Sequence, residues 1–287
     1  MEKSAHDTFF VTECLDLENI YIQTSFNAGT STSWVRADPL QTDIAIVDFS
    51  NMTTEWWGVN DQIKSHAQRI ANGTGAIVVV PDMYNGKQGL NAEEASHLMG
   101  NLDWKNAIQQ LDQLVEDLRD EKSHNQPPSD IRKVGCIGFC MGSALTLALA
   151  SRYTGKPHPL NACVAFYGVP DQKTFDLSHI PLKTPVQAHF GALDAHKGFS
   201  DIETAKKLEQ LWKKAVKEKG GRHAEGIHKD EFDVYIYDSY GHAFMNDEAW
   251  SRERRRELKM AGEYDHDFAN QVWSKVFAFF TKHLKSV

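Results

Sequence analysis

The sequence has few cysteines, no long apolar run and no excess of basic residues, and each absence excludes a class of protein. The four cysteines, at positions 14, 136, 140 and 163, fit no Cys-x-x-Cys pattern of a zinc or dithiol site. No stretch approaches the roughly 18 apolar residues of a membrane span, and residues 1–8 lack the apolar core of a secretory signal. With 31 basic against 39 acidic residues, the net charge of −8 argues against nucleic acid as a partner. We therefore expect a cytoplasmic protein with free thiols that binds neither nucleic acid nor membrane.

Nucleotide-binding motifs are also absent. The sequence contains no Gly-x-Gly-x-x-Gly fingerprint and no Walker pattern, so we predict that the protein uses no cofactor and no metal. The densest basic run, residues 252–256, is interrupted by Glu253 and flanked by Glu248 and Glu257. It is interpreted as the solvated face of a helix.

Short runs rich in Val, Ile and aromatic residues alternate with amphipathic stretches along the chain. The predicted strands are residues 43–49, 76–80, 133–139, 162–167, 185–190 and 232–237. The predicted helices are residues 60–72, 104–120, 141–152, 202–216 and 268–284. This alternation predicts an α/β fold with a mostly parallel central sheet and helices on both faces. The polar loops 121–130 and 217–230 are too short to separate domains, so residues 1–287 are expected to form a single domain, with residues 20–26 as an antiparallel edge strand.

The strongest chemical signal is the pentapeptide Gly-Phe-Cys-Met-Gly at residues 138–142, between a predicted strand and a predicted helix. This is the nucleophile-elbow pattern Gly-x-Ser-x-Gly with Cys140 in place of serine. The tight turn needs small flanking residues, and it places the thiol at a helix N-terminus, where the thiolate form is favoured. Cys136 and Cys163 lie inside predicted strands and are interpreted as core residues.

A thiol nucleophile needs a base, and the base needs an orienting acid, in the chain order nucleophile, acid, histidine. Asp194 follows the strand 185–190 and His242 follows the strand 232–237. Both would lie at the carboxyl ends of strands, where α/β sheets place ligands. Asp238 is a weaker candidate for the acid, and His196 is too near Asp194 in sequence for the usual order.

At this point the chain resembles the dienelactone hydrolase (carboxymethylenebutenolidase) family of α/β-hydrolase-fold proteins. The resemblance covers residues 40–285 and is carried by residues 55–60 (EWWGVN), 81–84 (PDMY), 138–143 (GFCMGS), 166–168 (FYG), 191–194 (GALD) and 241–244 (GHAF). The cysteine elbow together with the Glu-x-x-Gly-Val-Asn loop is specific, because most α/β hydrolases use serine and lack that glutamate.

The resemblance implies a catalytic triad of Cys140, Asp194 and His242, with Glu55 beside the thiol to control its protonation. It also implies an oxyanion hole formed by the backbone N–H groups of Trp56 and Met141. The candidate substrate-binding residues are Trp57, Tyr84, Lys87, Phe139, Tyr167 and Phe244.

The sequence departs from the family at the arginines that hold a substrate carboxylate, because Gly86 and Asn246 stand at those positions and Lys87 is the nearest cation. We therefore expect a hydrolase that cleaves a small ester or lactone through a thioester acyl-enzyme. A general carboxylesterase or thiol acyltransferase on the same triad is the first alternative. A non-catalytic binding protein is the second, and either a monomer or a homodimer fits the sequence.

Overall fold

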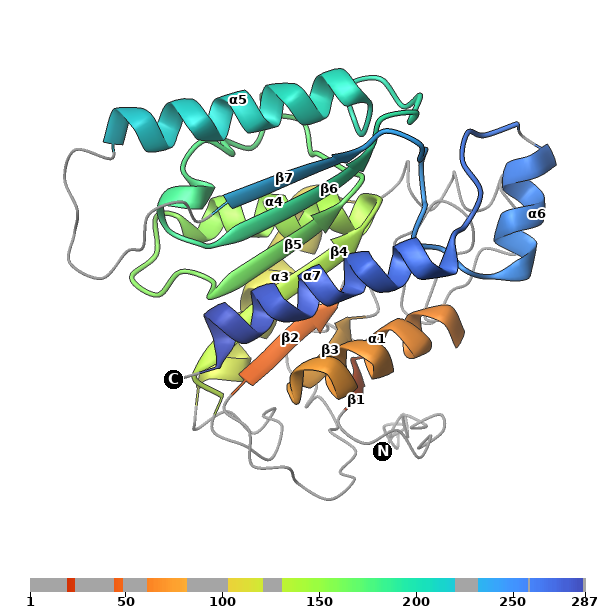
Figure 1. Ribbon diagram of the computed structural model, residues 1–287. Coiled ribbons are helices and arrows are strands. Elements are labelled where there is room, and N and C mark those ends of the chain that lie inside the picture. Colours follow the sequence, from red (N-terminus) through yellow and green to blue (C-terminus); the bar gives the residue numbers. More distant parts are fainter. Residues whose placement is uncertain are drawn as a thin grey trace, which may run out of the picture.

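A seven-stranded sheet forms the centre of the molecule, as the computed structural model in Figure 1 shows. The structure describes residues 20–23, 44–48, 61–81, 103–120, 131–219, 232–257 and 259–285. The strands are β1 (Ile20–Gln23), β2 (Ile44–Asp48), β3 (Ile77–Pro81), β4 (Lys133–Phe139), β5 (Ala162–Phe166), β6 (Val186–Gly191) and β7 (Phe232–Tyr237). Their order in the sheet is β1-β3-β2-β4-β5-β6-β7, and every neighbouring pair is parallel. The predicted α/β fold is therefore confirmed.

The antiparallel direction expected for the edge strand is wrong. β1 pairs parallel with β3, with Ile20 opposite Val78 and Gln23 opposite Pro81. An alternating pattern identifies a half-buried strand, but it carries no information on the direction in which the strand pairs.

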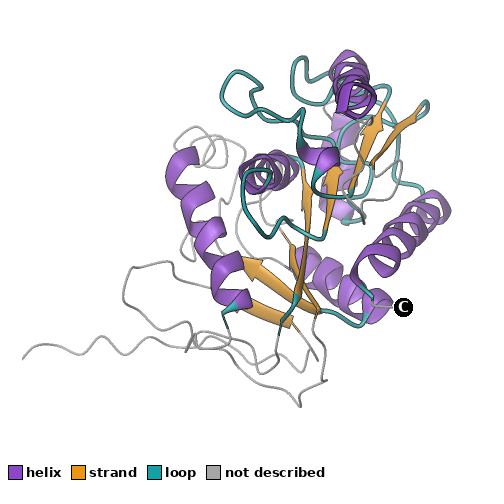
Figure 2. Cartoon of the chain, turned by 90° about the vertical axis from the view of Figure 1, so that its left-hand side faces the viewer, coloured by secondary structure: helices purple, strands orange, loops and turns teal. Residues whose placement is uncertain are grey.

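Helices cover both faces of the sheet, so that the strands lie between two layers of helix in Figure 2. The helices are α1 (Asp61–Thr74), α3 (Trp104–Arg119), α4 (Met141–Tyr153), α5 (Ile202–Lys219), α6 (Ala249–Glu257) and α7 (His266–Leu284). Helices α3, α4 and α5 pack on one face, and α1 and α7 pack on the other. Strands covered on both faces are mostly apolar, and β2, β3, β5 and β6 are buried at every residue.

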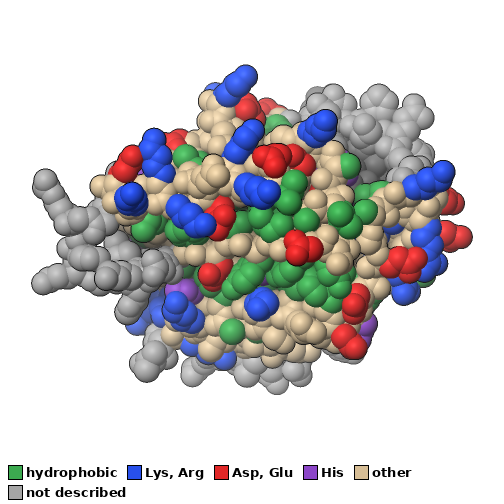
Figure 3. Space-filling model, turned by 45° about the horizontal axis from the view of Figure 1, so that its top comes forward, with side chains coloured by type: hydrophobic (Ala, Val, Ile, Leu, Met, Phe, Trp, Pro, Cys, Tyr) green, Lys and Arg blue, Asp and Glu red, His purple; other side chains and the backbone are tan. Residues whose placement is uncertain are grey.

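Strand β7 ends the sheet and is only half-buried along most of its length. Figure 3 views the molecule from the α5 side and shows apolar side chains in the middle of a surface dotted with both signs of charge. Among the described residues, no helix combines the length and apolar character needed to cross a bilayer.

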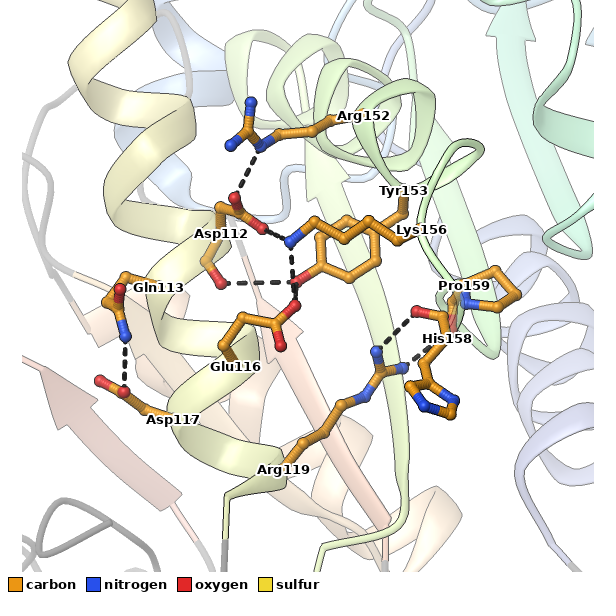
Figure 4. A network of polar contacts seen from close by, with 10 residues as sticks. All are labelled: Asp112, Gln113, Glu116, Asp117, Arg119, Arg152, Tyr153, Lys156, His158 and Pro159. Atoms are coloured by element: carbon orange, nitrogen blue, oxygen red, sulfur yellow. Dashed lines mark hydrogen bonds and ion pairs between the residues drawn. The ribbon is translucent and has the colours of Figure 1, made fainter.

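A polar network fastens the end of α4 to α3 (Figure 4). Asp112 of α3 accepts hydrogen bonds from Lys156 and from Arg152, the latter at 2.6 Å. The buried hydroxyl of Tyr153 donates to Glu116 at 2.9 Å, and burial raises the pKa of this phenol. Because α4 carries Cys140 at its other end, this network fixes the helix while staying away from the thiol.

Candidate active site

Cys140 lies in a strained turn between β4 and α4. Its backbone has φ 53° and ψ −117°, a conformation that residues other than glycine rarely adopt. The turn is so tight that a Cβ on Gly138 would lie 2.2 Å from the carbonyl oxygen of Gly142. The Cys140 N–H donates to the Phe166 carbonyl at 2.9 Å, which ties the turn to β5. Glycine is therefore required at position 138 by the close approach of the backbone.

The chain after β5 closes the other side of this turn. A Cβ on Gly168 would lie 2.1 Å from the Cys140 carbonyl oxygen. The Ser143 hydroxyl donates to the Gly168 carbonyl at 2.7 Å. Tyr167, which precedes this glycine, has φ 41°, so the chain that packs against Cys140 also has unusual backbone geometry.

His242 lies in the turn after β7 and faces the thiol. Its Nε2 atom is 3.3 Å from Cys140 Sγ, although the two residues are 102 positions apart. Arg255 of α6 holds this turn from behind, because its guanidinium donates to the carbonyls of Ala243 at 3.1 Å and Asn246 at 3.2 Å. Arg255 is only 3% exposed, so the interpretation of residues 252–256 as a solvated face is wrong at this position. A guanidinium with five donors can satisfy several turn carbonyls at once.

Asp194 lies after β6, on the far side of His242 from the thiol. Cys140, His242 and Asp194 thus form a row of three side chains joined by short contacts. Its Oδ2 accepts from His242 Nδ1 at 2.7 Å. The two turns approach each other closely, since a Cβ on Gly191 would lie 2.3 Å from the Tyr240 carbonyl oxygen. The structure thus brings together Cys140, His242 and Asp194, as expected from three turns at the carboxyl ends of parallel strands.

The charges on this row support one another. Burial alone would lower the pKa of His242, but the negative charge of Cys140 and the hydrogen bond to Asp194 raise it to about 10. Burial alone would raise the pKa of Asp194, but the hydrogen bonds from His196 and His242 hold it far below its usual range. At neutral pH the arrangement therefore favours a protonated His242 beside an ionised Asp194.

Two polar partners of this row were not predicted from the sequence. His196 Nδ1 lies 2.8 Å from Asp194 Oδ1, and Ser200 Oγ lies 3.2 Å from His242 Nδ1. Both belong to the turn that begins at Asp194. The signal that could have found them is their place two and six residues after the acid, in a turn that must fold back over it.

Some of the other predicted site residues lie in the described part of the chain, and the rest lie outside it. Met141 is the first residue of α4, so its N–H lies at the free end of the helix beside Cys140. Phe139, Tyr167 and Phe244 are almost fully buried, and the Tyr167 ring packs edge-on against His242 with centroids 5.1 Å apart. The residues outside the described part of the chain are Glu55, Trp56, Trp57, Tyr84, Gly86 and Lys87.

Asp194, His196 and His242 each offer an atom that could bind a metal ion, and these atoms lie within 4.8 Å of one another. Both histidine Nδ1 atoms are, however, already engaged by the two oxygens of the same carboxylate. The donor set therefore fits a hydrogen-bonded row better than an ion site.

The sequence of this chain is similar to that of known proteins. Residues 45–284 match the model of the dienelactone hydrolase family. "Protein usf" of Aquifex pyrophilus is 29% identical over 237 residues, covering 80% of this chain and 86% of that protein. A protein of Aquifex aeolicus named "Putative carboxymethylenebutenolidase" is 24% identical, with the same coverage.

Among solved structures, a "Putative Dienelactone Hydrolase" from Klebsiella pneumoniae superposes with a TM-score of 0.59. It is 19% identical, and the match covers 91% of this chain and 97% of that one. At this identity the likeness concerns the fold.

Proposed function

The chain belongs to the dienelactone hydrolase family of carboxylic-ester hydrolases, and from this premise we propose that it cleaves a small ester or lactone with Cys140 as the nucleophile. The observation that carries the proposal is the continuous row from thiol to carboxylate. His242 Nε2 lies 3.3 Å from Cys140 Sγ, and its Nδ1 lies 2.7 Å from Asp194 Oδ2. A nucleophile, a base and an orienting acid within hydrogen-bond reach are what covalent catalysis of acyl transfer requires.

In the first step the Cys140 thiolate attacks the carbonyl carbon, and the carbonyl oxygen becomes an oxyanion. The N–H of Met141 at the start of α4 is one donor for this oxyanion, and the N–H of Trp56 is the second donor that the family resemblance implies. In comparable sites one such donor is worth about 3–4 kcal/mol. The carbon–oxygen bond then breaks, the leaving oxygen takes the proton from His242, and the acyl group stays on sulfur as a thioester.

Acylation itself prepares the second step. The charge of Cys140 is the largest influence that raises the pKa of His242, and it disappears when the sulfur carries an acyl group. His242 then becomes a base that takes a proton from water, while Asp194 keeps the ring oriented. The hydroxide formed attacks the thioester, the acid departs, and the thiolate and imidazolium are restored.

The substrate class follows from what replaces the family arginines. Asn246 is 4% exposed, its N–H donates to the Ala243 carbonyl, and its side-chain oxygen accepts from Glu248 N–H at 3.1 Å. Asn246 therefore stabilises the turn in which it lies, and it offers no positive charge to a substrate carboxylate. A neutral ester or lactone suits this site better than an anionic one.

The experiment compares wild type with Cys140→Ala on p-nitrophenyl acetate, a neutral enol lactone and cis-dienelactone. Turnover that is lost in a folded Cys140→Ala variant supports the nucleophile, and the preferred substrate defines the class. Retained turnover in that variant would refute the proposal. Adding an alcohol or thiol acceptor tests the acyltransferase alternative, because a transferase would form the new ester faster than the free acid.

If wild type turns over none of the three compounds, the result favours the alternative that the protein binds a ligand without catalysing a reaction. A folded site without any reaction of Cys140 toward activated esters would contradict the mechanism at its first step.

A further inference from the structure

Asp194 is shared between two histidines. Its Oδ2 accepts from His242 Nδ1 at 2.7 Å, and its Oδ1 accepts from His196 Nδ1 at 2.8 Å and from the His196 backbone N–H at 3.0 Å. A carboxylate can only accept, so both Nδ1 atoms must carry hydrogen. The tautomer of each ring is thereby fixed, and each ring can take a further proton only at Nε2.

The two rings differ in their access to solvent. The side chains of Asp194 and His242 are 0% and 1% exposed, whereas the side chain of His196 is 49% exposed. The ring centroids of His196 and His242 are nonetheless only 4.4 Å apart. His196 is therefore the solvent-facing member of this group of three side chains.

We propose that His196 is a positioning residue that orients Asp194. When His196 is protonated, the His242 imidazolium loses its Nε2 proton more readily. This inference rests on the proposed function, because it assigns His196 a part in tuning the base of that mechanism. Its role would be to keep His242 a free base in the acyl-enzyme at lower pH than a lone Asp–His pair allows.

The physical reason is competition for one carboxylate. A proton on His196 neutralises part of the Asp194 charge that holds the His242 imidazolium, and it places a second cation 4.4 Å from that ring. Both effects act in the same direction, since like charges at this distance disfavour each other. The charge on one ring therefore acts on the other through the shared carboxylate and across the short distance between the rings.

Within the described part of the chain, the other titratable or charged groups that contact the two rings or adjoin His196 in the turn are Asp194, Cys140, Tyr167, Lys197 and Asp201. Of these, the Asp201 carboxylate is held by Gly198 N–H at 2.8 Å and by the Thr204 hydroxyl. It is therefore directed to the start of α5, and Asp194 remains the anion that the two rings share.

The test uses two variants and a matched control. His196→Asn keeps a hydrogen-bond donor near the Nδ1 position but cannot be protonated, and His196→Ala removes both. The control is His179→Asn, because His179 makes the same kind of contact, Nδ1 to Asp176 Oδ2 at 3.1 Å, with a side chain 41% exposed. The profile of kcat against pH is recorded with a substrate whose initial burst shows that deacylation limits turnover.

We expect the acid limb of kcat to move up by about one pH unit in both His196 variants. His196→Ala should also lower the plateau about tenfold, and His196→Asn should retain more of it, because a charge-assisted hydrogen bond orients Asp194. His179→Asn should keep the wild-type profile. An acid limb that stays in place in a folded His196→Asn variant would overturn the proposal.

A second measurement separates this inference from the proposed function. In the Cys140→Ala background, the His242 ring is titrated by NMR with and without His196→Asn. The midpoint should rise by about one unit in the double variant. An unchanged midpoint refutes the role of His196 even where Cys140 proves essential, and a raised midpoint supports it even where esters prove to be the wrong substrate.

Discussion

Replacing Gly168 with alanine tests how tightly the turn after β5 is fitted against Cys140. The added Cβ would lie 2.1 Å from the Cys140 carbonyl oxygen and 2.9 Å from its carbonyl carbon. Both are backbone atoms, so no side-chain rotation can relieve the clash. The added Cβ would also lie 3.0 Å from the Phe199 ring, which is tighter than an ordinary van der Waals contact.

The size of the effect follows from these distances. A relaxed carbon–oxygen contact is about 3.3 Å, so one of the two turns must move by about 1 Å. Strain of this kind costs about 1–3 kcal/mol of stability. A displacement of 1 Å at reacting groups lowers kcat/KM about 100-fold, since the Sγ–Nε2 geometry is set by the same turn.

The assay combines urea denaturation with kcat/KM on a small ester, for Gly168→Ala and for Gly155→Ala. Gly155 is exposed at the end of α4, and a Cβ there meets nothing within 4 Å, so this control should keep wild-type activity and stability. A Gly168→Ala protein with wild-type kcat/KM and wild-type stability would refute the reasoning.

Two further predictions concern stability. Burial lowers the pKa of His66 to about 4 and that of His189 to about 3, whereas an unfolded histidine titrates near 6.5. Above pH 6.5 the two histidines leave the free energy of unfolding at its full value. Between pH 6.5 and 5 the unfolded chain binds protons that the folded protein does not, which lowers the free energy of unfolding by about 2 kcal/mol per histidine. Urea denaturation from pH 8 to 5 should show this loss, with a smaller slope in His66→Phe, and equal slopes would contradict it. Tyr153→Phe removes the hydroxyl that donates to Glu116 at 2.9 Å and should cost about 1 kcal/mol by the same assay. Its kcat/KM should stay at the wild-type value because Cys140 lies at the opposite end of α4; a large loss of activity would disprove that separation.

The strands and the order of the site residues could be predicted because they depend on local patterns. A run such as residues 162–167 is apolar throughout because helices cover both faces, and the structure places β5 at Ala162–Phe166. The elbow could be recognised because a strand-to-helix turn of this tightness needs glycine on both sides.

The contacts that complete the site could not be predicted, because they join turns whose relative positions only the fold determines. Arg255 is part of a charged run, and nothing in that run indicates that one guanidinium turns inward to the carbonyls after His242. Chain order argues against His196 as the base. Its actual place beside Asp194 depends on a turn that brings its ring back to the carboxylate.

The most direct test of the account is to locate the acyl group. Wild-type protein is mixed with p-nitrophenyl acetate, quenched in acid within the burst, digested and analysed by mass spectrometry. The account predicts an acetyl group on the peptide that contains Cys140, and none on the corresponding peptide of Cys140→Ala. Turnover with no acetyl group on Cys140, or with the acetyl group on another residue such as Ser143, would contradict it.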